Sequence, residues 1–320
     1  MTPTSKSASP TSASSRSAPD PGRAPRPSPL RLWLLASRPR TLPAAVAPVL
    51  VGTALAGAVD VFKPLRFVGA LIGSIFIQIG TNLANDYSDA RRGADTEDRL
   101  GPVRVTAGGL MPPRRVLLGT YVAFGIAVAA GAYLIAVAGW QLLAVGIASI
   151  VAGILYTGGP KPYGYEGLGE LFVFLFFGIV AVVGSYFVQI EHLRWEAFAL
   201  AVPVGLLASG ILVVNNVRDA DTDRRAGKRT LAVRLGRPAA RKLFAAMLVV
   251  AYVVPVVLPF ASRPLSLWLL LPLLTIPLAL RLVRTVNTRT DGPALNGALA
   301  GTGQLLALFS LLLAVGVLVS

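Results

Sequence analysis

The chain has no cysteine and a single histidine, His192, among 320 residues. Without cysteine there can be no disulfide, no thiolate nucleophile and no thiolate-bound metal. One histidine also excludes a zinc site built from several imidazoles. Any catalytic metal must therefore be held by oxygen ligands.

Charged residues are also scarce: they make up 14% of the chain, whereas 54% of it is hydrophobic and the mean hydropathy is +0.66. A soluble domain carries about 25% charged residues. Apolar runs of about 20 residues, long enough to cross a bilayer as helices, recur along the sequence. The pattern predicts an all-α polytopic membrane protein with nine transmembrane helices, near residues 42–60, 65–85, 116–138, 140–157, 168–190, 197–217, 241–261, 265–284 and 294–319.

The basic residues are distributed unevenly about these predicted spans. With a cytoplasmic N-terminus, 26 of the 30 Lys and Arg residues fall on the inside, and the four on the outside are Lys63, Arg66, Arg194 and Arg263. This asymmetry is the one that orients membrane proteins, so the net charge of +15 indicates topology and contact with membrane lipid rather than nucleic acid. We expect an integral protein of a bacterial-type plasma membrane, with a disordered cytoplasmic tail over 1–29 and one transmembrane domain over 30–320.

Acidic residues are few, and eight of the fifteen lie in two short segments. The first runs over 82–98 and begins with NLANDYSD (82–89), and the second runs over 215–230 and begins with NNVRDADTD (215–223). Each follows an apolar run, at the predicted cytoplasmic end of an even-numbered span. Two comparable helix ends that face each other across a bundle would form a pseudo-symmetric pocket.

Helical spacing selects the side chains that can converge in this pocket. Asn82, Asp86 and Asp89 share one face of the first helix, and Asn85 with Asp89 forms an overlapping pair. In the second segment a stripe four residues apart contains Asn215, Asp219 and Asp223, whereas Asp221 points elsewhere. The four converging carboxylates are Asp86, Asp89, Asp219 and Asp223.

Four carboxylates without histidine or cysteine suit Mg²⁺, which prefers oxygen ligands and binds through a few carboxylates together with substrate phosphates. Interleaved cations can engage the remaining phosphate oxygens. They are Arg91, Arg92, Arg104, Arg218, Lys228 and Arg229. We predict a diphosphate–magnesium site that favours departure of diphosphate. The alternative is that these are ordinary solvated charges of cytoplasmic loops.

A third segment on the same side, YTGGPKPYGYEGLGE (156–170), is rich in glycine and proline and indicates irregular backbone near the bilayer surface. Its functional candidates are Lys161, Tyr165 and Glu170, unless it is only a tight turn. The aromatic run FVFLFF (172–177) is more typical of packing, with a wall for a reactive cation as the alternative.

These motifs, together with GKRTLAVRLG (227–236), resemble the UbiA superfamily of intramembrane prenyltransferases over roughly residues 30–320. Within it they are most similar to the branch that prenylates 1,4-dihydroxy-2-naphthoate. The resemblance implies a nine-helix bundle with a cytoplasmic polar cap. It also implies Mg²⁺-dependent ionisation of a polyprenyl diphosphate and attack by an aromatic ring. Loss of CO₂ from the ring would then give demethylmenaquinone.

The resemblance also assigns residues. Asn82, Asn85, Asp86 and Asp89 match its first motif; Asn216, Asp219 and Asp223 match its second; Asp95 matches a further acidic position; and Lys161, Tyr165 and Glu170 fall near the substrates.

Two other functions remain open. A related prenyltransferase could use hydroxybenzoate, homogentisate or haem as its acceptor. A cation-coupled transporter is also conceivable, since buried carboxylates mark ion pathways. The predicted carboxylates, however, lie at helix ends, and Gln78 is the polar candidate within a span.

Overall fold

A computed structural model describes residues 27–94, 100–262 and 265–320, and these ranges contain helices and connecting turns but no strand. Most of the predicted tail and the candidate ligand Asp95 lie outside the described residues. The helices are α1 (Pro29–Ser37), η1 (Pro39–Thr41), α2 (Pro43–Gly57), α3 (Pro64–Arg91), α4 (Pro113–Ala138), α5 (Gln141–Leu155), η2 (Tyr163–Glu166), α6 (Gly169–Val173), η3 (Phe174–Val180), α7 (Ala181–Ile190), α8 (Trp195–Arg225), α9 (Leu231–Leu235), α10 (Arg237–Ala261), η4 (Leu267–Thr275), α11 (Ile276–Thr288) and α12 (Gly292–Leu318).

Seven of the described helices are long and apolar enough to cross a membrane. An eighth span is added if α1–η1 and α2, which are bent by 54° near Leu42, form one span. The helix α5 is apolar but shorter. Each of the nine predicted segments coincides with helix. The protein is therefore an all-helical integral membrane protein, while the count of nine spans stays a prediction.

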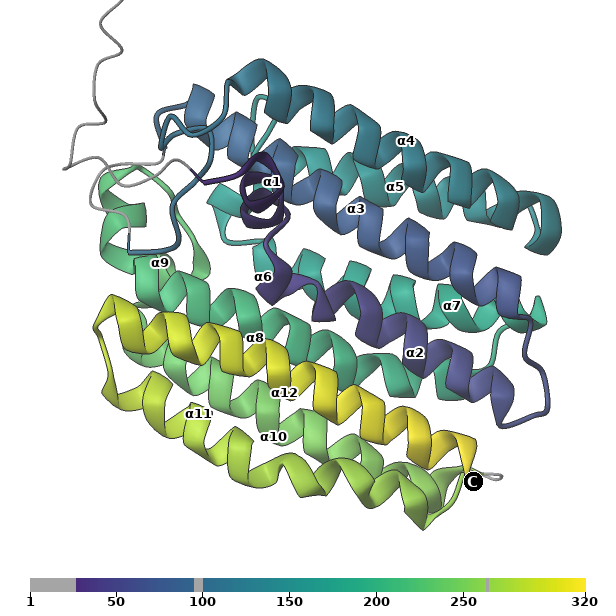
Figure 1. The fold of residues 1–320 in the computed structure, drawn as a ribbon. Helices are drawn as coiled ribbons and strands as arrows, with labels where there is room; N and C mark the ends of the chain where they lie inside the picture. The colour runs from purple at the N-terminus through teal and green to yellow at the C-terminus, as the bar shows by residue number, and fades with distance from the viewer. Residues whose placement is uncertain (1–26, 95–99, 263–264) are drawn as a thin grey trace, which may run out of the picture.

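The larger half of the bundle is centred on α8, which packs with α2, α7, α10 and α12 around an extensive apolar core (Figure 1). Close helix approach requires glycine at one crossing: a Cβ on Gly178 would lie 2.7 Å from the Cα of Gly205. Small residues permit this contact because no side chain separates the two backbones. The π-helical segment η3 is thereby held against α8.

The smaller half consists of α3, α4 and α5, which lie together along one side of the bundle (Figure 1). A separate small core joins α1, α3 and α4 near the polar end and includes Ala36, Leu83 and Val116. Between the two halves lies a cavity, described below.

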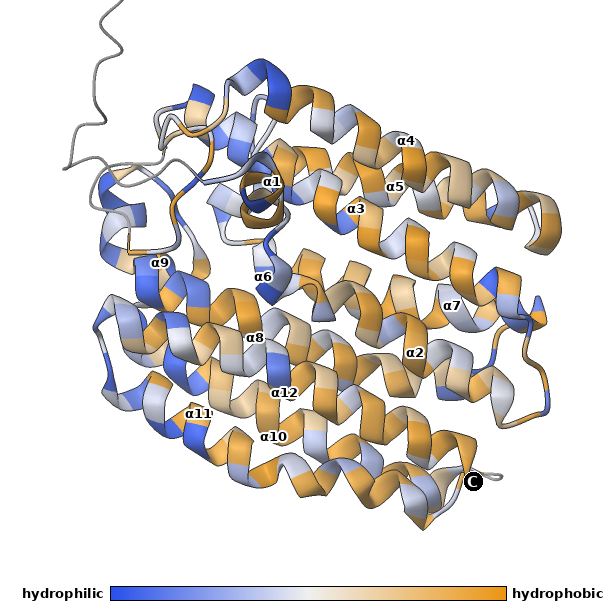
Figure 2. Ribbon diagram, in the orientation of Figure 1, coloured by the Kyte–Doolittle hydropathy of each residue, from blue (hydrophilic) through white to orange (hydrophobic). Residues whose placement is uncertain are grey.

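The acidic segments lie at one end of the bundle, where hydrophilic residues gather around α9 and the adjoining loops (Figure 2). The expectation that two helices continue through these segments is confirmed, because α3 ends at Arg91 and α8 ends at Arg225. Both helices therefore present their carboxylates with regular helical spacing.

Candidate active site

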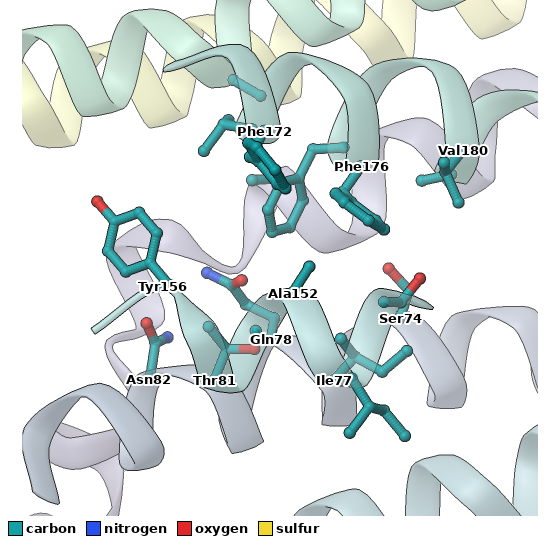
Figure 3. Close-up of a pocket in the computed structure, with 18 of the residues that line it drawn as sticks. Ser74, Ile77, Gln78, Thr81, Asn82, Ala152, Tyr156, Phe172, Phe176 and Val180 are labelled. Atoms are coloured by element: carbon teal, nitrogen blue, oxygen red, sulfur yellow. The ribbon is translucent and has the colours of Figure 1, made fainter. Parts of the chain in front are cut away.

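A cavity of about 610 Å³ separates the two halves of the bundle and begins at the acidic ends of α3 and α8. One wall is α3 with α4 and α5, and the opposite wall is α6, η3 and α7. Figure 3 shows Gln78, Thr81 and Asn82 of α3 across the cavity from Phe172 and Phe176. The predicted site residues that line it are Asn82, Asn85, Asp89, Arg104, Tyr165, Asn216, Asp219, Asp223 and Lys228.

At the end of α3, Asp89 is the acidic residue that faces the cavity. It is 1% exposed, and its two oxygens accept hydrogen bonds from different segments. The Arg104 guanidinium lies 3.0 Å from Oδ2, and the Tyr165 hydroxyl donates to Oδ1 at 2.5 Å. This carboxylate therefore links α3 to the loop that contains Arg104 and to the segment that contains Tyr165.

Asp86, one turn earlier, does not line the cavity. Its carboxylate accepts hydrogen bonds from the backbone N–H groups of Val105 and Thr106, at 3.1 and 3.0 Å. Such bonds satisfy donors that would otherwise be buried without partners. Asp86 thus fixes the segment that holds Arg104, whereas its predicted role as a metal ligand stays a prediction.

The asparagines of α3 are held by neighbouring elements. The Asn82 amide donates to the carbonyl of Ser37 at 3.0 Å, and the Asn85 carbonyl accepts from the Thr157 hydroxyl at 2.9 Å. Each amide thus has a fixed orientation on the cavity wall.

At the end of α8, Asp219 lines the cavity while its neighbour Arg218 is turned into the protein. Arg218 is 1% exposed and donates to Oδ1 and Oδ2 of Asp219 at 2.8 and 2.6 Å. Its Nη1 donates to Asn296 at 2.7 Å, and Nη2, which already donates to Asp219, also donates to Asn215 at 2.8 Å. Arg218 is therefore a buried anchor of Asp219 and does not line the cavity, and its predicted contact with phosphate stays a prediction.

Asp223 and Lys228 complete this end of the cavity. The Lys228 ammonium lies 3.9 Å from an oxygen of Asp223 and 4.8 Å from the centre of the Tyr165 ring. Both side chains are mostly shielded from solvent. Tyr165 therefore touches the acidic end of α3 through its hydroxyl and the cation following α8 through its ring.

Asp221 is exposed and pairs with Arg237 at 2.7 Å, which confirms that it points away from the converging stripe. Five other predicted residues do not line the cavity. Arg91, Arg92, Lys161 and Arg229 are exposed. Glu170 is buried behind the wall and accepts a hydrogen bond from the Asn216 amide at 2.8 Å.

Aromatic rings form a continuous series along the wall beyond the acidic end. The Tyr163 ring is stacked on Phe172 at 4.0 Å and meets Tyr156 edge-on at 5.5 Å; Phe172 is followed by Phe176 at 6.2 Å. Burial raises the pKa of the Tyr163 phenol, whose hydroxyl donates to the carbonyl of Ala152 at 2.9 Å. The run 172–177 is therefore largely a cavity wall rather than packing alone.

Known proteins resemble this chain in sequence and in fold. The model of the UbiA prenyltransferase family matches residues 45–299. The chain belongs to the UbiA prenyltransferase family. The resemblance found in the sequence motifs is thereby confirmed, and the matched range contains both acidic helix ends.

Relatives in this family share the whole length of the domain. A protein of Mycobacterium leprae named 1,4-dihydroxy-2-naphthoate octaprenyltransferase is 42% identical over 282 residues, which cover 88% of this chain and 94% of the relative. A protein of Escherichia coli with the same name is 39% identical over 294 residues, which cover 90% of this chain and 95% of the relative.

Solved structures show the same fold. A UbiA homolog from Archaeoglobus fulgidus bound to GPP and Mg²⁺ aligns with a TM-score of 0.64 at 15% identity, covering 90% of this chain and all of that chain. At this identity the likeness concerns the fold alone.

The oxygen ligands that line the cavity of this UbiA family member fit a metal ion that is held partly by the protein and partly by a bound phosphate group. Among the described residues, no group of three or more acidic or imidazole side chains is placed to hold a metal ion. Asp89, Asp219 and Asp223 nevertheless line one cavity with several amide oxygens. Mg²⁺ is usually bound through one or two carboxylates plus substrate phosphates, so these residues fit a magnesium–diphosphate pair.

Two residues that line the cavity were not predicted from the sequence. Arg38 lines it near Asn82, and its backbone adopts a left-handed conformation with φ of 53° just before Pro39. Thr230 lies on the wall after α8, 5% exposed, and its hydroxyl has no hydrogen-bond partner among the described residues. Neither residue has an acidic or helical pattern that could have revealed it.

Proposed function

We propose that this protein transfers a polyprenyl group from polyprenyl diphosphate to 1,4-dihydroxy-2-naphthoate. The products are CO₂, diphosphate and demethylmenaquinone, formed in its quinol state. The observation that carries the proposal is identity of 42% and 39% to the two octaprenyltransferases over nearly the whole chain. A polar-ended, otherwise apolar cavity suits a substrate with a diphosphate head and a long hydrocarbon tail.

The acidic end of the cavity is the proposed diphosphate site. Asp89, Asp219 and Asp223 would hold Mg²⁺, which when bound neutralises charge on the diphosphate. Arg104 and Lys228 stand beside these carboxylates and supply fixed positive charge for phosphate oxygens. Asn85 of α3 and Asn216 of α8 add amide groups that line the same cavity. Fixed charges of this kind stabilise a leaving group without reorganisation during the reaction.

The aromatic wall is the proposed place of bond exchange. As the allylic carbon–oxygen bond breaks, both its electrons leave with the diphosphate and a carbocation remains. Tyr156, Tyr163, Phe172 and Phe176 line the cavity beyond the acidic end, and aromatic rings can stabilise such a cation. The electron-rich acceptor ring then forms the new carbon–carbon bond and its carboxylate leaves as CO₂.

We assign the buried residues positioning roles. Asp86 fixes the Arg104 loop, Arg218 orients Asp219, and Glu170 orients the Asn216 amide. Lys161, Arg91 and Arg229 are exposed at the polar end, where they suit contact with substrate during entry.

We further propose that the bent α1–α2 pair and α5 also cross the bilayer, giving nine spans with the acidic ends at a cytoplasmic polar cap. The support is the distribution of Lys and Arg, 26 of which then fall on the cytoplasmic side.

A membrane assay tests the reaction. Membranes containing the protein, incubated with Mg²⁺, a polyprenyl diphosphate and dihydroxynaphthoate, should yield the prenylated ring, CO₂ and diphosphate. A chelator should abolish turnover and added Mg²⁺ should restore it. Equal or better turnover with hydroxybenzoate, homogentisate or haem would replace the proposed acceptor while keeping the prenyl donor.

Cellular quinones give a second test. Deleting the gene should remove menaquinone from the membranes while other quinones remain, and restoring it should recover menaquinone. Unchanged menaquinone in the deletion strain would contradict the proposed acceptor.

A further inference from the structure

Four helical glycines line the part of the cavity remote from its acidic end. They come from four different elements and are here called the distal glycines: Gly73 of α3, Gly131 of α4, Gly146 of α5 and Gly184 of α7. Glycine inside a helix lowers helix stability relative to alanine, so each position calls for a reason.

Close packing does not explain why these four positions are glycine. A Cβ added to Gly131, Gly146 or Gly184 would meet no atom within 4 Å, and one added to Gly73 would lie 4.0 Å from the Cβ of Ala130. Gly153, which also lines the cavity, differs because its Cβ would collide with the Thr81 hydroxyl. None of the distal glycines has a positive φ that would exclude other residues.

The four glycines lie in the same half of the cavity. Gly73 precedes Asp89 by sixteen residues of α3, a distance of about 24 Å along the helix. Gly131 is level with Gly73, since Ala130 is the nearest neighbour of that Cβ position. Gly146 follows the tight turn that joins α4 to α5.

Gly184 lies on the opposite wall, in the first half of α7 and five residues before Gln189. The Gln189 end of α7 is level with the start of α3, because the Lys63 backbone N–H donates to the side chain of Gln189 at 2.7 Å. All four therefore line the part of the cavity that is remote from its acidic end.

The helix that includes Gly184 keeps one row of side chains on the cavity over a long distance. One row of its lining residues recurs every four positions, as Phe172, Phe176, Val180, Gly184 and Val188, and a second row lies beside it from Val173 to Ser185. In a pure α-helix such a row drifts by about 160° over sixteen residues. The wider i→i+5 turns of η3, over Phe174–Val180, offset this drift and keep the row facing the cavity.

An independent feature shows which end of the cavity takes a polar group. The Thr230 hydroxyl, buried on the wall by Asp223 and Lys228, has no hydrogen-bond partner among the described residues. A buried hydroxyl requires a partner, and a ligand with a polar head provides one. The tail of the same ligand then extends toward the distal glycines.

We propose that the distal glycines set the length of the isoprenoid chain that the cavity admits, by leaving side-chain space empty where the distal units of the chain lie. The inference rests on the proposed prenyl transfer and adds the residues that select the donor. Larger side chains at these positions shorten the isoprenoid chain that the cavity admits and leave the diphosphate site unchanged.

The test compares two glycines of α4. Gly131→Leu fills the distal cavity, whereas Gly125→Leu is the matched control, since Gly125 is exposed, open to substitution and does not line the cavity. Each variant is assayed with geranyl diphosphate and with octaprenyl diphosphate. We expect Gly131→Leu to lose about tenfold or more in kcat/KM for the octaprenyl donor, with the geranyl donor nearly unchanged. Gly125→Leu should match the wild type with both.

Equal loss on both donors, or wild-type behaviour of Gly131→Leu, would overturn the inference. Gly146→Ala and Gly184→Ala repeat the test with smaller groups, should Gly131→Leu fail to fold, and should show the same preference more weakly. A wild-type protein that turns over neither donor would instead overturn the proposed function, so the two failures are distinguishable.

Discussion

The acidic ends of α3 and α8 have similar sequences but hold their carboxylates by different means. At the end of α3, Asp89 is bound by Arg104 and Tyr165, both from loops elsewhere in the chain. At the end of α8, Asp219 is bound by its own neighbour Arg218, which Asn296 of α12 fixes in turn. The α8 carboxylate is thus preorganised by the helical core, whereas the α3 carboxylate depends on loop positions.

This difference suits a site assembled from two halves. A carboxylate fixed in the large core gives a constant reference position, and one held by loops can adjust when a bulky substrate enters. The four predictions below alter one half at a time and are ordered from the largest expected effect to the smallest.

Replacing Arg218 by leucine should have the largest effect on stability. It leaves Asp219 as a buried charge without its main partner, which costs about 3–5 kcal/mol. Thermal unfolding in detergent measures this loss. Asp221→Asn is the control, because it breaks an exposed pair on the same helix and should cost at most about 1 kcal/mol. Similar stability of the two variants would show that burial does not distinguish the pairs.

Replacing a cavity carboxylate should act on the reaction instead. Asp89→Asn and Asp223→Asn keep the side-chain shape and remove the charge that is proposed to hold Mg²⁺. We expect kcat to fall by about 10²–10³-fold in each, with folding retained. Turnover of purified variants measures the effect, with Asp221→Asn as an active control. Near-normal turnover of either variant would remove that residue from the proposed site.

Asp86 tests whether the α3 end depends on its loop. Asp86→Ala leaves the buried amides of Val105 and Thr106 without acceptors, at a cost of about 1–3 kcal/mol each. Because this loop holds Arg104, we expect a raised KM for prenyl diphosphate in addition to lower thermal stability. Asp86→Asn retains one acceptor oxygen and should recover part of both properties. A metal ligand would behave differently, since Asn would then be as inactive as Ala.

The sequence predicted the helices and the α8 stripe because both depend on local periodicity. Asn215, Asp219 and Asp223 all line the cavity, and Asp221 points away, as their spacing requires. The roles of Asp86 and Arg218 could not be predicted in this way. Their partners lie 19 and 78 residues away, at Val105 and Asn296, and helical spacing contains no information about such contacts.

The sequence offered the aromatic wall only as the alternative to packing, for a related reason. An α-helical period places Phe172 and Val188 on different sides of a helix, and the π-helical segment that brings them to one side has no plain signature in the sequence. Thr230 and Arg38 are likewise defined by the cavity that surrounds them rather than by any pattern of their own.

Tyr165 connects the two halves, and its replacement should have the smallest effect. Tyr165→Phe removes the hydrogen bond to Asp89 and keeps the ring beneath the Lys228 ammonium. Loss of one hydrogen bond to a charged group corresponds to roughly 1.5 kcal/mol, so we expect about a tenfold fall in kcat/KM. Tyr87→Phe is the matched control, because the Tyr87 hydroxyl accepts only a surface bond from Arg91. If Tyr165→Leu is no worse than Tyr165→Phe, the contact with Lys228 adds nothing. In that case Tyr165 acts only through its hydrogen bond to Asp89.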